Sequence, residues 1–176
     1  DNRFISNFAV YHQRYSTNTF PTWSLAQPFR VIAHNGEINT LKGNKNWMEA
    51  HEPRMHHASY DKDIDDLKPI IDRTASDSAA LDSTIELLVR TKRSLPMAKL
   101  MTIPEAFAHR RDFPKKLKDL YTYANAVMES WDGPAAICGC HDQWAIAGMD
   151  RNGLRPLRYT LTNDFLITGS ETGMVE

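Results

Sequence analysis

The hydrophobic and polar positions divide the chain into three zones. Residues 1–47 hold short apolar runs between polar loops, and residues 4–11 (FISNFAVY) and 29–33 (FRVIA) read as strands. The dipeptide Asn35-Gly36 follows the second run and predicts a turn, because both residue types tolerate positive φ. Residues 48–75 are charged and loop-like.

Helical periodicity begins at about residue 76 and continues to about residue 130. One predicted face is apolar and contains Leu81, Ile85, Leu88 and Val89, and a second contains Leu117, Leu120, Tyr121, Ala124 and Met128. Short strands separated by turn residues follow across residues 135–170. Strands, then helices, then a strand meander predict an α+β fold with antiparallel sheet.

Composition narrows the class of protein. A chain of 176 residues is long enough for one domain with a core, and we expect no second domain. Lys plus Arg number 21 against 22 Asp plus Glu, so charge favours neither nucleic acid nor an anionic membrane as partner. Two cysteines are too few for a disulfide-stapled secreted scaffold, which favours a reducing compartment. We expect no metal site, because His51 and His56 are five apart and Pro53 interrupts the helix that would align them.

Three polar clusters carry the candidate chemistry. Arg14 offers a fork of donors that suits a carboxylate, although taken alone an Arg is more often part of a solvated surface ion pair. Asn35 and Gly36 could direct an amide and a backbone N–H at a developing oxyanion, or could simply form a hairpin turn. Asp77 could accept hydrogen bonds from a substrate ammonium group, or could belong to a helix cap.

Taken together, these clusters belong to a longer series of motifs. The series reads HQRYSTNTFPTW, AHNGEIN, GNKNW, SDSAALDS, PEAF, WDGPAAI, DRNGLRPLRY and GSETG. It resembles the glutaminase domain of the glutamate synthase large subunit and, more broadly, the class II glutamine amidotransferases, which are N-terminal-nucleophile hydrolases. The resemblance extends over residues 4–176, which would form the C-terminal portion of one such domain (residues 1–176).

The resemblance implies a four-layer αββα sandwich that hydrolyses L-glutamine to glutamate and ammonia. Carried over by position, Arg14 would bind the glutamine α-carboxylate and Asp77 its α-ammonium group. Asn35 and Gly36 would form the oxyanion hole, and Thr17 would line the pocket.

The family's nucleophile is the thiol of an N-terminal Cys, with its own α-amine as base. Neither Cys138 nor Cys140 can fill that role, and their spacing on a predicted strand points both to one face as small buried side chains. The chain begins at Asp1 and reads as cut from a longer protein, so we expect the isolated chain to be inactive. A non-catalytic glutamine-binding module and another class II amidotransferase remain as alternatives.

The resemblance also implies a larger setting. In that family, ammonia passes to a second site where 2-oxoglutarate is reductively aminated to glutamate, using NADPH, NADH or ferredoxin as reductant. FMN and an iron–sulfur cluster belong to other domains of the large subunit, and we expect this chain to bind neither. The partners implied are L-glutamine, the remaining domains and a small reductase subunit. The implied location is the cytoplasm, or a plastid for a plant or algal parent.

Overall fold

The computed structural model describes residues 1–16 and 20–175. Its α-helices are α1 (Lys42–His51), α2 (Asp77–Arg90), α3 (Leu95–Thr102) and α4 (Lys115–Val127), and its 3-10 helices are η1 (Trp23–Leu25), η2 (Glu52–Arg54) and η3 (Asp61–Leu67). The strands are β1 (Ile32–Gly36), β2 (Ala135–His141), β3 (Trp144–Met149), β4 (Arg158–Leu161) and β5 (Leu166–Gly169).

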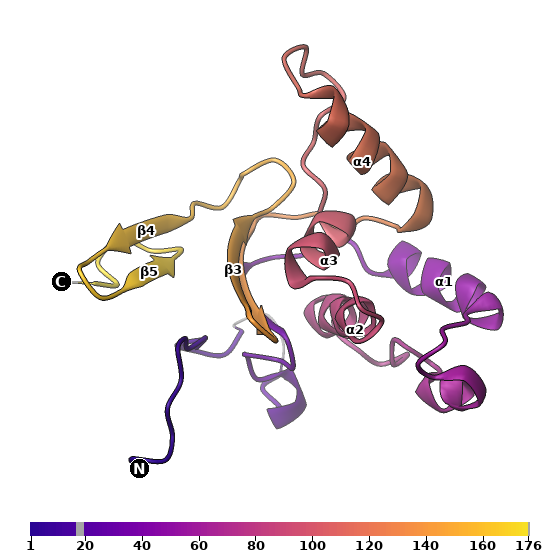
Figure 1. Ribbon diagram of the computed structural model, residues 1–176, viewed down its shortest axis with the longest axis horizontal. Coiled ribbons are helices and arrows are strands. Elements are labelled where there is room, and N and C mark those ends of the chain that lie inside the picture. The colour runs from indigo at the N-terminus through magenta and orange to yellow at the C-terminus, as the bar shows by residue number, and fades with distance from the viewer. Residues whose placement is uncertain (17–19, 176) are drawn as a thin grey trace.

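The strands form two antiparallel sheets. β2 lies between β1 and β3 in the larger sheet, so β1 is an edge strand among the described residues, while β4 and β5 form a separate hairpin. The helices lie on one side of the larger sheet and the β4–β5 hairpin lies on the other (Figure 1). The α+β class with antiparallel sheets is therefore confirmed.

The main core lies between the larger sheet and the helices. The predicted apolar face of α2 is confirmed, since Leu81, Ile85, Leu88 and Val89 are all buried. This face packs in one cluster with Ile32 of β1, Ile137 of β2 and residues of α3. Asp82, also on α2, accepts backbone hydrogen bonds from Arg30, Val31 and Ile32 and so fixes the start of β1 against the helix.

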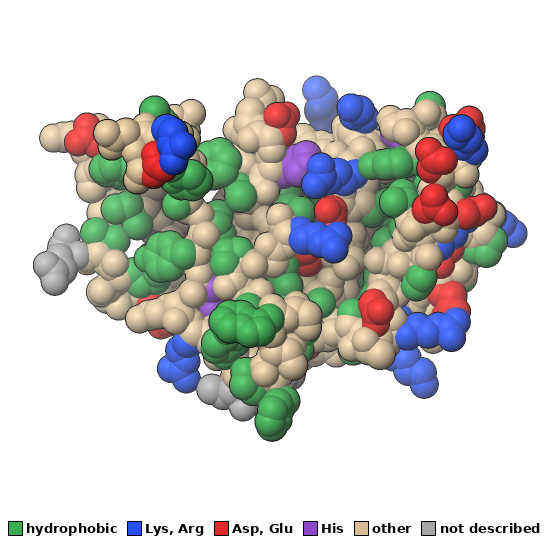
Figure 2. Space-filling view, turned by 90° about the horizontal axis from the view of Figure 1, so that it is seen from below, with side chains coloured by type: hydrophobic (Ala, Val, Ile, Leu, Met, Phe, Trp, Pro, Cys, Tyr) green, Lys and Arg blue, Asp and Glu red, His purple; other side chains and the backbone are tan. Residues whose placement is uncertain are grey.

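The opposite side of the larger sheet is only thinly covered. Ala145, Ala147 and Met149 of β3 are exposed on it, and Tyr159, Leu161 and Leu166 of the hairpin expose more than half of their surface. Hydrophobic side chains gather on the side of the molecule that carries the hairpin, whereas charged side chains gather over the helices (Figure 2). We call this thinly covered side of the sheet the open face.

Two expectations for the N-terminal zone are wrong. Residues 4–11 form no strand, and Phe4 and Ile5 are almost fully exposed, because no neighbouring strand pairs with this segment in the described structure. Asn35-Gly36 is not a turn: both residues belong to β1 and pair with Ala136 and Ala135.

The middle zone also departs from its pattern. The loop predicted for residues 48–75 contains the end of α1 together with η2 and η3. α1 forms despite a Gly and two Asn residues because tertiary contacts override weak helix propensity. Its Asn44 is buried and donates to the Ser130 carbonyl over 3.1 Å, and Met48 is buried beside it in the core. On α4, by contrast, only Ala124 is buried, and the predicted apolar residue Leu117 is exposed.

Candidate functional site

The candidate residues gather around β1. The backbone of His34 faces the free edge of this strand, where its N–H donates to Gln27 Oε1 over 2.6 Å and its carbonyl contacts His12 Nε2 at 3.1 Å. Successive side chains of a strand point to opposite sides. The side chains of His34 and Asn35 therefore leave β1 toward the helices and toward the open face, respectively.

On the helix side, His34 meets the beginning of α2. His34 is 5% exposed, and its Nε2 lies 2.6 Å from Ser78 Oγ. Burial lowers the pKa of His34 to about 4; the nearby Asp77 carboxylate opposes this shift and His12 adds to it. The imidazole is therefore neutral at pH 7.

Asp77 is the first residue of α2, and it is half-buried. Its Oδ1 accepts from Ser78 N over 2.5 Å and from Ser78 Oγ over 2.8 Å. The capping role expected for this cluster belongs to the preceding residue, Ser76, whose side chain accepts from Ala79 N. Asp77 Oδ2 has no hydrogen-bond partner among the described residues, which leaves one carboxylate oxygen for a ligand.

Arg14 lies in an exposed segment beyond His12. The contact between His12 and the His34 carbonyl brings this segment to the free edge of β1, and Tyr15 packs edge-on against Trp23 with ring centroids 6.4 Å apart. The contacts given for residues 1–16 and 20–175 join Arg14 directly to neither Asp77 nor Asn35. Thr17, which we predicted to line the pocket, lies outside the described residues.

Asn35 projects toward the open face, where it meets the segment that follows β5. Its Nδ2 donates to Ser170 Oγ over 2.8 Å and to Glu171 Oε1 over 2.9 Å. Glu171 also pairs with Arg155 over 2.6 Å, and this hydrogen bond holds the pKa of Glu171 below its ordinary value. The Asn35 amide thus binds a carboxylate oxygen in this structure, which is the type of acceptor that an oxyanion donor must bind.

Gly36 has a structural requirement of its own. Its φ is +139°, and a Cβ at this position would lie 1.9 Å from the Pro134 carbonyl oxygen. Gly133 makes the reciprocal approach, with φ of +134° and a built Cβ 2.2 Å from the Glu37 carbonyl oxygen. Only glycine fits the close crossing of these two segments, whatever Gly36 contributes to a substrate.

The two cysteines lie side by side along β2, as their spacing predicts. Cys138 pairs with Ala33 and Ala147, and Cys140 pairs with Ala145, so both face the open side of the sheet. Both are half-buried rather than buried. Burial raises the pKa of the Cys138 thiol, which disfavours the thiolate needed for nucleophilic attack.

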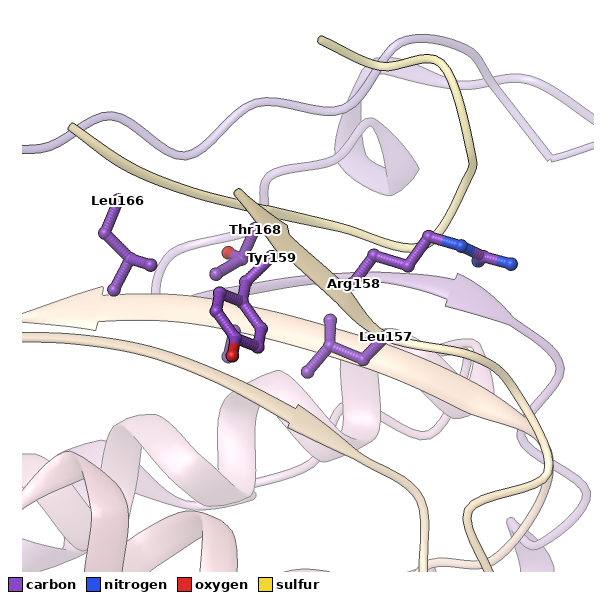
Figure 3. A pocket seen from close by; sticks show the side chains of 6 residues that line it. Leu157, Arg158, Tyr159, Leu166 and Thr168 are labelled. Carbon is purple, nitrogen blue, oxygen red and sulfur yellow. The ribbon is translucent and has the colours of Figure 1, made fainter. Parts of the chain in front are cut away.

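A hollow of about 370 Å³ lies between β3 and the β4–β5 hairpin. In Figure 3, Leu157, Tyr159, Leu166 and Thr168 lie along it, while the Arg158 guanidinium points away. The lining is mainly apolar, and it contains neither Arg14, Asp77 nor Asn35. The hollow is therefore a gap in packing over the open face and not the candidate site.

Two further features of the described chain concern metals and membranes. Between residues 1–16 and 20–175, no group of three or more His, Cys, Asp or Glu side chains is arranged to hold a metal ion. No helix in the same ranges is long and apolar enough to cross a membrane.

Sequence reasoning named Arg14, Asp77 and Asn35 but missed the side chains that hold them. His34, Ser78 and Glu171 occur in the quoted motifs AHNGEIN, SDSAALDS and GSETG, yet no role was assigned to them. The contacts of His34 with Ser78 and of Asn35 with Glu171 join residues 44 and 136 positions apart. No local pattern reports such contacts.

The chain belongs to the class II glutamine amidotransferases: the sequence model of the family described as "Glutamine amidotransferases class-II" matches residues 1–176. It is 58% identical over 177 residues to the NADPH glutamate synthase large chain of Azospirillum brasilense, covering 100% of this chain and 12% of that protein. It is 49% identical to the NADH glutamate synthase of Saccharomyces cerevisiae, covering 98% of this chain and 8% of that protein. It is 47% identical to ferredoxin-dependent glutamate synthase 2 of Synechocystis, and this match covers 98% of this chain and 11% of that protein.

These relatives confirm the resemblance that the motifs indicated. The chain spans about a tenth of the length of the relatives it matches, from 8% to 12%.

Proposed function

We propose that residues 1–176 hold L-glutamine in the glutaminase domain of a glutamate synthase. Glutamine has an α-carboxylate, an α-ammonium group and an amide, and the candidate site offers a matching group for each. The observation that carries the proposal is that two segments bearing opposite charges both contact His34: the segment of Arg14 through His12, and the start of α2, with the half-buried Asp77 carboxylate, through Ser78. A zwitterionic head group needs one such cation and one such anion.

At the other end of the substrate, the Asn35 amide and the Gly36 N–H would serve as oxyanion donors. The contact with Glu171 supports this role, because a negatively charged oxygen there accepts a hydrogen bond from Asn35 Nδ2 over 2.9 Å. Removing one such donor typically costs ~3 kcal/mol of transition-state stabilisation. Thr17, outside the described residues, stays a predicted pocket residue.

The catalytic thiol would come from an N-terminal Cys outside residues 1–176. Cys138 lies within β2 with a raised thiol pKa, and neither it nor Cys140 carries a free α-amine. In the proposed reaction the α-amine, with a pKa of about 8, takes the proton of the thiol, and the resulting thiolate attacks the glutamine amide carbon. The protonated amine then gives that proton to the leaving ammonia. Water then hydrolyses the thioester to glutamate. The 176-residue chain alone would bind glutamine without turning it over.

The segment that carries this Cys would cover the open face, which bears both Asn35 and the exposed apolar residues of β3 and the hairpin. The ammonia released would be used elsewhere in the large chain to aminate 2-oxoglutarate reductively. FMN, an iron–sulfur cluster and contacts with a small reductase subunit would belong to those other domains. The printed names of the relatives, all glutamate synthases, support this larger setting.

The test uses the full-length polypeptide that contains these residues and compares glutamine-dependent with ammonia-dependent glutamate formation. Arg14→Ala should raise the KM for glutamine by about 30-fold, since a hydrogen-bonded charge contributes about 2 kcal/mol. Ammonia-dependent synthesis should stay unchanged. Arg93→Ala, at an exposed position between α2 and α3, is the control and should change neither activity. A fall of both activities together in Arg14→Ala, or an unchanged KM, would contradict the assignment.

A further inference from the structure

Besides Asp82, a second link between β1 and α2 runs through three side chains: His34, Ser78 and Asp77. His34 Nε2 lies 2.6 Å from Ser78 Oγ, and Ser78 Oγ lies 2.8 Å from Asp77 Oδ1. The three side chains therefore form one continuous hydrogen-bonded row from the strand that carries Asn35 to the carboxylate at the helix start.

The other ring nitrogen of His34, Nδ1, indicates which group donates in each hydrogen bond of the row. His34 Nδ1 is buried and has no hydrogen-bond partner among the described residues. An unpaired N–H donor is rarer in protein interiors than an under-satisfied acceptor, so the proton of the neutral ring belongs on Nε2. His34 Nε2–H then donates to Ser78 Oγ, and the Ser78 hydroxyl proton is directed to Asp77 Oδ1.

This order of groups is not a nucleophilic triad. In a Ser-His-Asp triad the carboxylate orients the imidazole through Nδ1, and the serine oxygen is free to attack. Here the carboxylate contacts the serine instead, and His34 Nδ1 has no described partner. The Ser78 hydroxyl is therefore committed to Asp77.

We propose that His34 and Ser78 are positioning residues that orient the Asp77 carboxylate for selection of the substrate's α-ammonium group. The inference rests on the proposed function and goes beyond it by assigning substrate discrimination to residues that would not touch the substrate. With Oδ1 held by the Ser78 N–H and hydroxyl, Oδ2 is fixed in one orientation as the acceptor for the ammonium group. Because His34 lies next to Asn35 in β1, the same row also ties Asp77 to the strand that carries Asn35, whose side chain leaves on the other side of the sheet.

The experiment measures discrimination between L-glutamine and glutaramate, which is glutamine without the α-amino group, in the full-length polypeptide. Ser78→Ala should raise the KM for L-glutamine about fivefold, the equivalent of one neutral hydrogen bond, with kcat within about twofold. The KM for glutaramate should not change, so the preference for glutamine falls about fivefold. Ser78→Thr retains the hydroxyl and should restore the preference.

A double-mutant cycle separates positioning from a general loss of structure. In an Asp77→Asn background, Ser78→Ala should have no further effect on the preference, because the row acts only through the carboxylate. Equal losses for both substrates, or a Ser78→Ala effect that persists beside Asp77→Asn, would overturn the positioning role. If Asp77→Asn lowers the preference and Ser78→Ala does not, only the positioning role is wrong. If Asp77→Asn itself leaves the preference unchanged, the assignment of Asp77 to the ammonium group is wrong and the positioning role falls with it.

Discussion

Replacing Asp150 with Asn should destabilise the chain by about 2–4 kcal/mol, because one carboxylate organises the whole turn after β3. Asp150 Oδ1 accepts from Asn152 N and Leu154 N, and Oδ2 accepts from Ala135 N and Arg155 N, each over 3.0 Å. An Asn side chain has a single acceptor oxygen. Its NH₂ group must therefore face two backbone N–H groups, and each donor left unpaired in this partly buried turn costs about 1–2 kcal/mol.

The free energy of unfolding in urea measures this cost. The matched control is Asp142→Asn in the exposed turn between β2 and β3, where φ is +54° and Asn is well tolerated. The control should stay within about 0.5 kcal/mol of the parent. If Asp150→Asn also changes the free energy of unfolding by no more than about 0.5 kcal/mol, the four hydrogen bonds to the Asp150 carboxylate do not stabilise the turn as argued.

The pH dependence of the free energy of unfolding provides a second test of the same variant. Burial alone would raise the pKa of Asp150, but its backbone N–H bonds outweigh this effect and lower it. A depressed carboxylate pKa gives stability that is present above the unfolded pKa, ~4, and is lost as pH falls through the folded value. The difference between parent and Asp150→Asn should therefore hold from pH 7 to 5 and narrow only below about pH 4.

Two other perturbations test the surroundings of β1. Because the pKa of His34 is lowered to about 4, the unfolded chain takes up a proton between pH 6.5 and 4 that the folded chain does not, so stability falls on acidification. Between pH 7 and 5 the free energy of unfolding, measured in urea, should fall by about 2 kcal/mol. This fall should disappear in His34→Gln and persist in the control His56→Gln, which alters an exposed side chain. Gly36→Ala should cost about 3 kcal/mol or more in urea unfolding, because its Cβ would overlap the Pro134 carbonyl at a strained φ. Gly43→Ala, inside α1 with open space around the site of the new methyl group, should instead stabilise by about 0.5–1 kcal/mol.

The elements that the sequence predicted correctly are those whose signal is local. The apolar stripe of α2 repeats within a few turns, and the apolar runs of β2 and β3 are separated by a short turn. Both signals could therefore be recognised without knowing what these elements pack against. Residues 4–11 have an equally apolar pattern but no described strand to pair with, and a strand depends on such a partner.

For the candidate site, too, local sequence suggested which residues matter, whereas their conformation and orientation depend on distant contacts. Asn35-Gly36 predicted a turn because the dipeptide tolerates positive φ, and Gly36 does have φ of +139°, but the freedom is used for a close crossing with Pro134 inside a strand. The motifs singled out Arg14, Asp77 and Asn35 as candidate site residues, and this assignment stays a prediction. The sequence did not predict the orientation of these groups, because it depends on contacts such as that of His34 with Ser78, 44 residues away.

The contacts of Asn35 impose a condition on any reaction at this site. A primary amide has two N–H protons, and Asn35 donates one to Ser170 Oγ and one to Glu171 Oε1. To stabilise an oxyanion, Asn35 must therefore turn one N–H away from its present acceptor. Glu171 is the acceptor to be displaced, because its carboxylate also has a cationic partner in Arg155 and lies exposed to solvent, where it loses little on release. In the proposed reaction the segment after β5 and the substrate's amide would thus compete for the same donor, and glutamine could use Asn35 only once Glu171 had moved away.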